Sequence, residues 1–150
     1  MVDIFDKKTR SRMMAGIRAK NTKPELLIRQ GLHRLGFRYR LHAANLPGKP
    51  DLVFRKYHAV ILVHGCFWHA HSCPLFKWPG TRQAFWREKI SANRERDQRQ
   101  LQQLSSRGWK VLTIWECALK GRGRRNLREV IHTTANWLQF DEQNAEILGK

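Results

Sequence analysis

Two apolar stretches joined by a long polar segment constrain the fold of this chain most strongly. Residues 59–63 read Ala-Val-Ile-Leu-Val, and residues 109–115 are apolar apart from one lysine and one threonine. Their length and their β-branched residues are typical of buried strands. The polar segment between them, over about 81–106, has the length of one long helix. A helical crossover places two strands parallel in one sheet, so the sequence predicts a mixed α/β fold with helices covering the sheet.

Helix start and stop signals locate the remaining elements. Thr22 can cap a helix in which Glu25 occupies the capping-box position, and Gly36 ends that helix. Thr81 is the predicted cap of the long helix and Gly108 its end. The predicted inward face of the long helix comprises Phe85, Ile90, Leu101 and Leu104. Further helices are predicted over about 7–18 and 127–138, and further strands over 37–41 and 51–54.

The length and composition fit a single domain. With 150 residues, of which 41% are hydrophobic, the chain can bury a core without disulfides. We expect one domain over residues 1–140, beginning with a helical segment over about 1–20. The last ten residues, 141–150, are polar and are predicted to be a loose tail.

The net charge points to a polyanionic partner. Lysines and arginines number 29 against 12 acidic residues, which gives a net charge of +17. A globule this basic repels itself, and a polyanion relieves the repulsion. An anionic membrane is the competitor, but no basic amphipathic anchor stands out. The cations are spread along the chain, which favours a broad surface that binds nucleic-acid phosphates. We expect the segment 1–20 to contact DNA as part of this surface. Cations on the long helix could follow the phosphates: Arg82, Arg87, Lys89, Arg94, Arg96 and Arg99.

No targeting segment is visible in the sequence. The first eight residues carry charge and contain no apolar core of signal-peptide length. The longest purely apolar run, residues 59–63, is far too short to cross a bilayer. We therefore expect a cytoplasmic protein associated with the nucleoid, in which cysteines stay reduced.

A run of metal-binding residue types follows the first apolar strand. Three histidines and two cysteines lie within residues 64–73. Cys66, His71 and Cys73 can reach one tetrahedral zinc ion from this loop, and Cys117 can complete the site if its strand lies beside the loop. The spacing is not that of an ordinary zinc finger. The alternative is a set of buried thiols with a surface histidine; clustering and the third cysteine favour zinc.

A second group of side chains could bind another metal. His64 and His69 lie outside the predicted zinc set, and Asp51 begins a strand antiparallel to the one leading into His64. The carboxylate can point towards the end of that neighbouring strand, where a carbonyl and imidazoles would join it. Such a group could bind Mg²⁺ and supply a base. The alternatives are a strand-edge carboxylate and ordinary hydrogen-bonded histidines.

Aromatic residues concentrate around these histidines and cysteines. Most aromatic residues in a protein serve core packing. Phe67 and Trp68, however, lie on a loop between predicted ligands, where a core role is less natural. Exposed aromatic side chains beside a basic surface can wedge between base pairs.

Five segments of the chain resemble the very-short-patch repair (Vsr) endonucleases, over roughly residues 6–122. They are Thr9-Arg10-Ser11, Leu46-Pro47-Gly48-Lys49-Pro50-Asp51, His64-Gly65-Cys66-Phe67-Trp68-His69, Phe85-Trp86-Arg87-Glu88-Lys89-Ile90 and Trp115-Glu116-Cys117-Ala118-Leu119. The resemblance implies a restriction-endonuclease-like fold related to the PD-(D/E)xK nucleases. It also implies a nick on the 5′ side of the thymine in a T·G mismatch, which arises when 5-methylcytosine deaminates.

The resemblance implies roles for individual residues around the cleavage site. Asp51 corresponds to the magnesium-binding aspartate and His69 to the catalytic histidine, with His64 beside it. Glu25 and Asp97 correspond to supporting acidic residues, although Glu25 also has its capping-box explanation.

The resemblance also implies the remaining ligands. The acid-x-Lys motif of the superfamily is absent, because the corresponding strand reads Ile61-Leu62-Val63. A backbone carbonyl replaces it in the family, which implies the Val63 carbonyl as a ligand of Mg²⁺. The implied ligands of Zn²⁺ are Cys66, His71, Cys73 and Cys117. The implied intercalating residues are Phe67, Trp68 and Trp86.

In the expected mechanism, Asp51 and the Val63 carbonyl hold Mg²⁺ at the scissile phosphate. His69, aided by Glu25, orients or deprotonates the attacking water, and His64 positions water or phosphate. We expect a monomer that acts on mismatched double-stranded DNA, with other repair proteins as candidate partners. Two alternatives stay open: a zinc-stabilised DNA-binding module without catalysis, and a nuclease of the same fold with a different DNA substrate.

Overall fold

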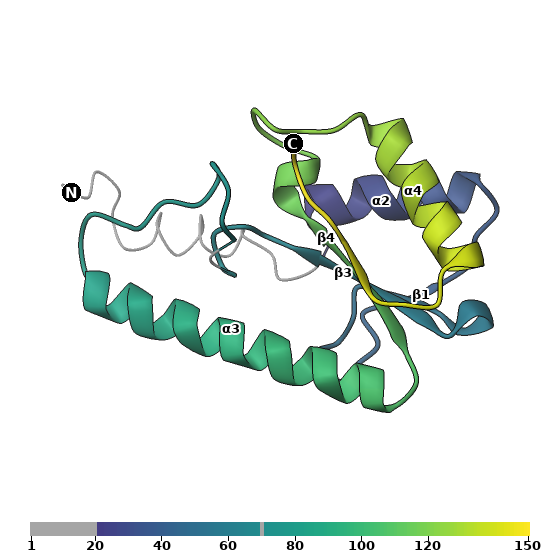
Figure 1. Cartoon of the computed structure of the whole chain (residues 1–150), viewed down its shortest axis with the longest axis horizontal. Helices are drawn as coiled ribbons and strands as arrows, with labels where there is room; N and C mark the ends of the chain where they lie inside the picture. Colours follow the sequence, from purple (N-terminus) through teal and green to yellow (C-terminus); the bar gives the residue numbers. More distant parts are fainter. Residues whose placement is uncertain (1–20, 70) are drawn as a thin grey trace.

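The computed structural model describes residues 21–69 and 71–150, and in this part of the chain five strands form one sheet (Figure 1). The two antiparallel pairs, β1–β2 and β2–β3, are followed by two parallel pairs, β3–β4 and β4–β5. The predicted parallel pairing of the two apolar strands is confirmed. The strands are β1 (Arg40–Leu41), β2 (Leu52–Phe54), β3 (Ala59–His64), β4 (Lys110–Trp115) and β5 (Ala145–Ile147).

Three α-helices in the described residues cover the sheet: α2 (Lys23–Arg34), α3 (Gln83–Ser106) and α4 (Leu127–Phe140). The helices α2 and α4 lie on one face and α3 lies on the other, as Figure 1 shows. None of the described helices is both long and apolar enough to cross a membrane. The helix predicted over about 7–18, and the segment 1–20 predicted to contact DNA, lie outside the described residues.

Burial on both faces explains the uninterrupted apolar run over residues 59–63 of β3. Ala59 and Ile61 pack into a core with α2 and α4, whereas Val60 and Leu62 pack into a second core with Leu104 of α3. Since successive side chains of a strand point to opposite faces, a strand covered on both sides needs an uninterrupted apolar run. The mixed α/β architecture predicted from these runs is confirmed.

The start of α2 follows its sequence signals with one difference. The Thr22 hydroxyl caps the helix and accepts a hydrogen bond from the Glu25 N–H at 3.4 Å. The Glu25 carboxylate accepts from the Asn21 N–H at 3.1 Å, one residue before the partner that a capping box would use. Gly36 has φ +98°, a conformation that favours glycine, and the helix ends two residues before it.

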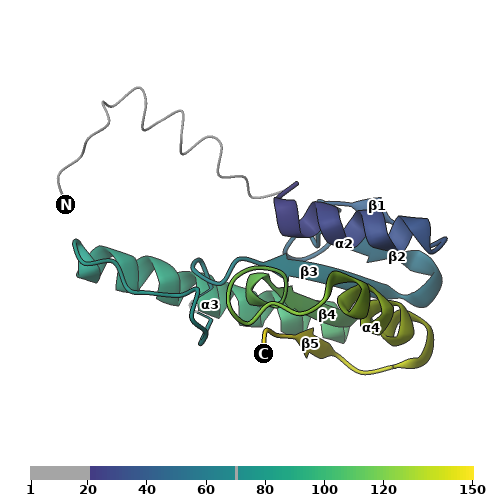
Figure 2. The ribbon, with the colours of Figure 1, turned by 90° about the horizontal axis from the view of Figure 1, so that it is seen from above.

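Two expectations about α3 are wrong. Thr81 does not cap the helix, because the residue before the first turn is Arg82, which makes no side-chain cap. Phe85 does not face inward and is 44% exposed, although Ile90 and Leu104 are buried. The physical reason is that the N-terminal half of α3 extends past the sheet (Figures 1 and 2), so there is no core for Phe85 to enter.

The expectation of a loose C-terminal tail is also wrong. Residues 145–147 form β5, which pairs with β4, and Ile147 is buried in the core. Lys150 then donates its N–H to the Gly123 carbonyl at 2.7 Å. At the other edge the strand predicted over 37–41 is reduced to the two residues of β1.

Candidate active site and metal cluster

A cleft beside the end of β3 is lined by residues singled out from the sequence. Asp51, Val63, His64, His69 and Asp97 all line this cleft, whose volume is about 1150 Å³. An adjoining hollow of about 1010 Å³ shares the last four of these residues and extends to the loop that follows β3. The structure therefore brings Asp51 and the two histidines to one cleft.

Strand pairing sets the position of Asp51. The residue precedes β2, and Leu52 pairs with Ile61, so continuing the register places Asp51 opposite Leu62 and next to Val63. Its Oδ2 accepts a hydrogen bond from the Val63 N–H at 2.7 Å. Burial raises the pKa of Asp51 to about 7; the Val63 hydrogen bond opposes this rise and the neighbouring Glu25 carboxylate adds to it. A cation at this carboxylate would stabilise its ionised form.

The two histidines form a stacked pair at the mouth of the cleft. The rings of His64 and His69 lie 3.9 Å apart and nearly parallel. Asp97, on α3, contacts Nδ1 of His69 through its carboxylate, which leaves Nε2 of His69 free of this contact. Burial lowers the pKa of His64 to about 3, and the His69 ring adds to this effect, so His64 is neutral at pH 7.

Glu25 has different partners from those expected. Its side chain is 1% exposed and its two oxygens lie 3.0 and 2.9 Å from Nε2 of His42. Arg29 forms a salt bridge with the same carboxylate at 2.9 Å. The expectation that Glu25 aids His69 does not match this geometry, because Asp97 is the carboxylate in contact with His69. The sequence analysis missed His42 and Arg29.

The residues at Asp51 fit a magnesium ion. Mg²⁺ prefers oxygen ligands and needs few from the protein, because it keeps several waters. The Asp51 carboxylate and the Val63 backbone line the same cleft and can supply such ligands. Ligand atoms of Glu25, His42 and Asp51 also lie within 4.8 Å of one another, so the negative charge is concentrated there.

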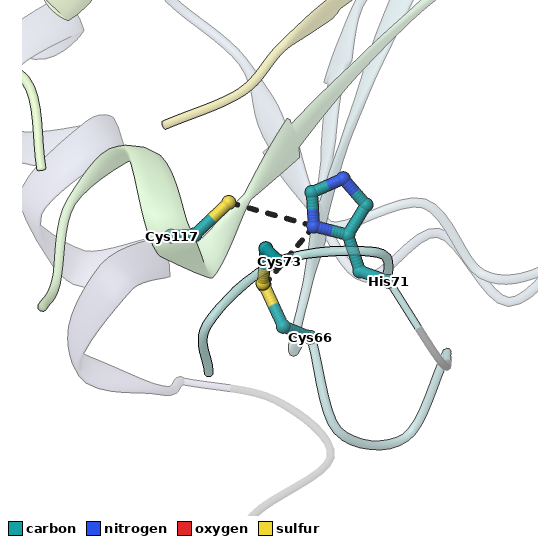
Figure 3. A group of neighbouring side chains, drawn as sticks. All are labelled: Cys66, His71, Cys73 and Cys117. Atoms are coloured by element: carbon teal, nitrogen blue, oxygen red, sulfur yellow. Dashed lines mark hydrogen bonds between the residues drawn. The ribbon is translucent and has the colours of Figure 1, made fainter. Parts of the chain in front are cut away.

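The four predicted zinc ligands lie together (Figure 3). Cys66, His71 and Cys73 are on the loop that follows β3, and Cys117 is in the turn that follows β4. Ligand atoms of Cys66, His71, Cys73 and Cys117 are within 4.8 Å of one another. Nδ1 of His71 is 3.5 Å from the Cys66 sulfur and 3.4 Å from the Cys117 sulfur. Sulfur and nitrogen ligands of one tetrahedral zinc are separated by about 3.6 Å, so these distances fit zinc.

Parallel pairing of β3 and β4 brings Cys117 to this loop. His64 pairs with Trp115, so the residues that follow the two strands emerge side by side. Cys66 is fully buried, and burial raises the pKa of its thiol. None of the three cysteines forms a disulfide, so each can lose its proton and bind a metal as a thiolate.

Trp115 and Glu116, for which the sequence predicted no role, connect the cluster to the cleft. The Trp115 ring stacks on His71 at 4.1 Å and meets the edge of His64 at 5.2 Å. Glu116 accepts a hydrogen bond from the Cys66 N–H at 3.2 Å. The position of Trp115 at the end of β4, level with His64, is the signal that could have identified it.

The predicted intercalating residues form one cluster beside the cleft. Phe67 contacts Trp68 and Trp86 with ring centroids 5.1 and 5.5 Å apart, and all three side chains are half-buried. Asn93 of α3 donates a hydrogen bond to the Trp68 carbonyl at 3.1 Å, which holds the loop against the helix.

A mixed sheet with helices on both faces, and a cleft lined by a carboxylate and two histidines, make this an α/β protein with a candidate active site. The comparisons with known proteins narrow the class to one family, and the chain belongs to the Vsr family. The family model for DNA mismatch endonuclease Vsr matches residues 2–75. The chain is 43% identical over 147 residues to DNA mismatch endonuclease Vsr of Escherichia coli (strain K12), covering 98% of this chain and 94% of that protein.

Other relatives carry the names of nicking enzymes. Type II nicking enzyme V.XorIIP of Xanthomonas oryzae pv. oryzae is 44% identical over 128 residues, which are 85% of this chain and 94% of the relative. Type II nicking enzyme V.NmeAIP of Neisseria meningitidis serogroup A is 46% identical over 122 residues, 81% of this chain and 87% of the relative.

Proposed function

We propose that this protein nicks double-stranded DNA on the 5′ side of the thymine in a T·G mismatch, by Mg²⁺-dependent hydrolysis that leaves a 5′-phosphate and a 3′-hydroxyl. The observation that carries the proposal is the meeting of Asp51, His64 and His69 at one cleft. The relatives named mismatch endonuclease and nicking enzyme support the reaction class. We also propose that the sheet is the core of a restriction-endonuclease-like fold.

Each residue at the cleft has a role that follows from its contacts. Asp51 and the Val63 carbonyl would hold Mg²⁺, which when bound neutralises charge on the scissile phosphate and stabilises the leaving oxygen. The Val63 N–H fixes the orientation of the Asp51 carboxylate. His69, held at Nδ1 by Asp97, presents Nε2 to the attacking water and accepts its proton. Neutral His64 stacks on His69 and restrains that ring.

In this proposal the aromatic cluster recognises the mismatch. A mismatch weakens base stacking, so inserting Phe67, Trp68 and Trp86 costs less there than in matched DNA. Exposed cations along α3 would contact the phosphates and make binding fall steeply with salt. These cations are Arg87, Lys89, Arg94, Arg96 and Arg99, with Arg82 just before the helix.

The Cys/His cluster has a structural role in this proposal. Cys66, His71, Cys73 and Cys117 would hold Zn²⁺, which when bound joins the loop after β3 to the turn after β4. Phe67, Trp68 and His69 lie within that loop, between the ligands. The cluster therefore determines where the aromatic side chains and the imidazole are held.

The test is a nicking assay with T·G and T·A duplexes of the same flanking sequence in the presence of Mg²⁺. We expect one nick 5′ to the mispaired thymine and none in the T·A duplex. Asp51→Ala should abolish nicking and preserve DNA binding, whereas Glu142→Ala, which removes an exposed carboxylate, should nick normally. Equal cutting of both duplexes would indicate a nuclease with another substrate. Binding without any nick would indicate a DNA-binding module.

Trp68→Ala tests the proposed intercalation separately. If Trp68 wedges into the duplex at the mismatch, its loss should reduce nicking of the T·G duplex more than binding to matched DNA. An equal loss in both measurements would mean that Trp68 only packs the loop.

A further inference from the structure

The free end of α3 carries two arginine–aromatic pairs, whose arginines are among the cations proposed above to contact phosphates but whose rings have no role so far. The guanidinium carbon of Arg87 lies 4.8 Å from the centroid of the Trp78 ring, and that of Arg82 lies 4.4 Å from the Phe85 ring. Trp78 is 41% exposed and Phe85 is 44% exposed. Both pairs lie in the arm, our name for residues 71–82 together with the first half of α3. Figures 1 and 2 show that the arm extends past the sheet.

Aromatic contacts connect the arm to the proposed intercalating residues. Trp78 meets the edge of Phe76 at 5.0 Å, and Phe76 contacts Phe67 at 6.0 Å. On the helix, Phe85 contacts Trp86 at 5.3 Å. A duplex held at Phe67 and Trp86 would therefore pass next to the exposed rings of the arm.

The charge of the arm is complementary to a polyanion. Lys77 adjoins Trp78 in the sequence, Arg82 and Arg87 lie over the exposed rings, and the one acidic residue of the arm is Glu88. Among the residues that the structure describes, neither arginine forms a salt bridge with a carboxylate. A guanidinium stacked on an aromatic ring is held in place while its N–H groups remain available to an anion.

Core packing does not account for these side chains. Exposed aromatic side chains that belong to one larger aromatic cluster, as Trp78 and Phe85 do through Phe76 and Trp86, mark a surface that binds a partner. The exposed rings alone would be enough to bind an uncharged protein surface. The three cations favour a partner that presents phosphates along an extended surface.

We propose that the Arg87–Trp78 pair, with Arg82–Phe85 beside it, is a second DNA contact that binds the phosphate backbone of the duplex flanking the mismatch. Trp78 holds the Arg87 guanidinium so that its N–H groups face one phosphate. This inference rests on the proposed function and adds to it a contact outside the intercalating cluster. It predicts a wider footprint on the duplex than the cleft and the intercalating cluster would give alone.

The test measures binding to a T·G duplex at several salt concentrations without Mg²⁺, so that no cleavage occurs. Arg87→Gln should weaken binding by about 3–10-fold and reduce the slope of log K against log [salt] by about 0.9, the value for one lost phosphate contact. Trp78→Leu should weaken binding in the same direction. The double variant should be no weaker than the worse single variant, because the pair acts as a unit.

Arg107→Gln is the matched control, since it removes the same charge at the opposite end of α3, where the side chain is also exposed. If Arg87→Gln and Arg107→Gln weaken DNA binding equally, the loss reflects net charge alone, and the proposal is overturned. A series of duplexes, each with one uncharged methylphosphonate at a flanking position, locates the phosphate that Arg87 contacts. At that position wild type and Arg87→Gln should bind equally. Thermal unfolding of each variant verifies that it is folded.

The outcomes separate this inference from the proposed function. If the wild-type protein does not nick the T·G duplex, the proposed function fails. If it nicks and Arg87→Gln binds DNA as tightly as wild type at every salt concentration, only the second contact fails.

Discussion

Asp51 contributes to the site at a cost to the stability of the metal-free protein. Its pKa is raised to about 7, chiefly by burial, against 3.8 for an aspartate in water. The folded state therefore holds the Asp51 proton more tightly than the unfolded state does. Stability must fall as pH rises from about 4 to about 7, and above this range the ionised carboxylate is fully destabilising.

Asp51→Asn removes this ionisation and should stabilise the protein when no metal is bound. We expect the free energy of unfolding to rise by about 2 kcal/mol or more at pH 8, and by less at pH 5, where folded Asp51 is still protonated. Urea unfolding at the two pH values measures the difference. Mg²⁺ should stabilise the wild type at pH 8 but not Asp51→Asn. A variant no more stable than wild type at pH 8 would contradict the prediction.

The sequence could predict the residues that local strand geometry brings together. Asp51 and His64 lie at neighbouring strand ends, so an antiparallel pair was enough to predict their proximity. His42 was not predicted, because the strand predicted over 37–41 was not continued by one residue. Continuing the register past Leu41 and Leu52 places His42 opposite Asp51, where its N–H donates to the Asp51 carbonyl at 3.1 Å. The contact of Asp97 with His69 depends on how α3 packs, which charge patterning does not determine.

At the level of the elements, the packing of α2 on α4 depends on the absence of a side chain at Gly31. A Cβ added there would lie 2.5 Å from Cδ1 of Ile131 and 2.7 Å from its Cγ1. Alanine normally stabilises a helix interior relative to glycine by about 1 kcal/mol. Here overpacking opposes this gain.

We expect Gly31→Ala to lower the free energy of unfolding by about 1–2 kcal/mol, because Ile131 is buried and cannot move away freely. Gly80→Ala is the control, since a Cβ at that position meets no atom within 4 Å. Denaturant unfolding of the two variants provides the comparison. Stabilisation by Gly31→Ala would show that the two helices separate at little cost.

The strand β5 was not predictable from its own composition. Three residues, Ala145 to Ile147, lie in a polar stretch that carries no strand-length apolar pattern. Their conformation comes from the open edge of β4, to which they pair in parallel, and from the core that receives Ile147. The two apolar strands were predictable because burial on both faces requires the long apolar runs that the sequence displays.

Ile147→Ala distinguishes a paired strand from a loose tail. Removing a buried isoleucine side chain costs about 2–4 kcal/mol of unfolding free energy, whereas a loose tail would tolerate the change. Glu146→Ala is the matched control, because the adjacent side chain is exposed. Thermal and denaturant unfolding measure both variants. Equal stability of the two would contradict the pairing of β5.

Across the whole molecule, neighbouring strands set most of the geometry of the candidate site. The ends of β2 and β3 position the groups proposed to bind Mg²⁺, and the ends of β3 and β4 position the Cys/His cluster. Trp115 connects the two regions, because its ring contacts His64 at the cleft and His71 of the Cys/His cluster. The arm leaves the sheet beside the same strand ends, so a change at the Cys/His cluster is expected to reach the aromatic residues and the cleft.

Removal of zinc tests this connection. We expect the purified protein to contain about one zinc ion per chain and to lose it to a strong chelator together with mismatch nicking. The melting temperature should fall, and tryptophan fluorescence should change because Trp115 stacks on His71. Returning zinc should restore all three properties. Cys117→Ala should reproduce the loss and Ser72→Ala, at an exposed loop position, should not. Full mismatch nicking by protein shown to be free of zinc would mean that buried thiols alone hold the loop and that the cluster is not a metal site.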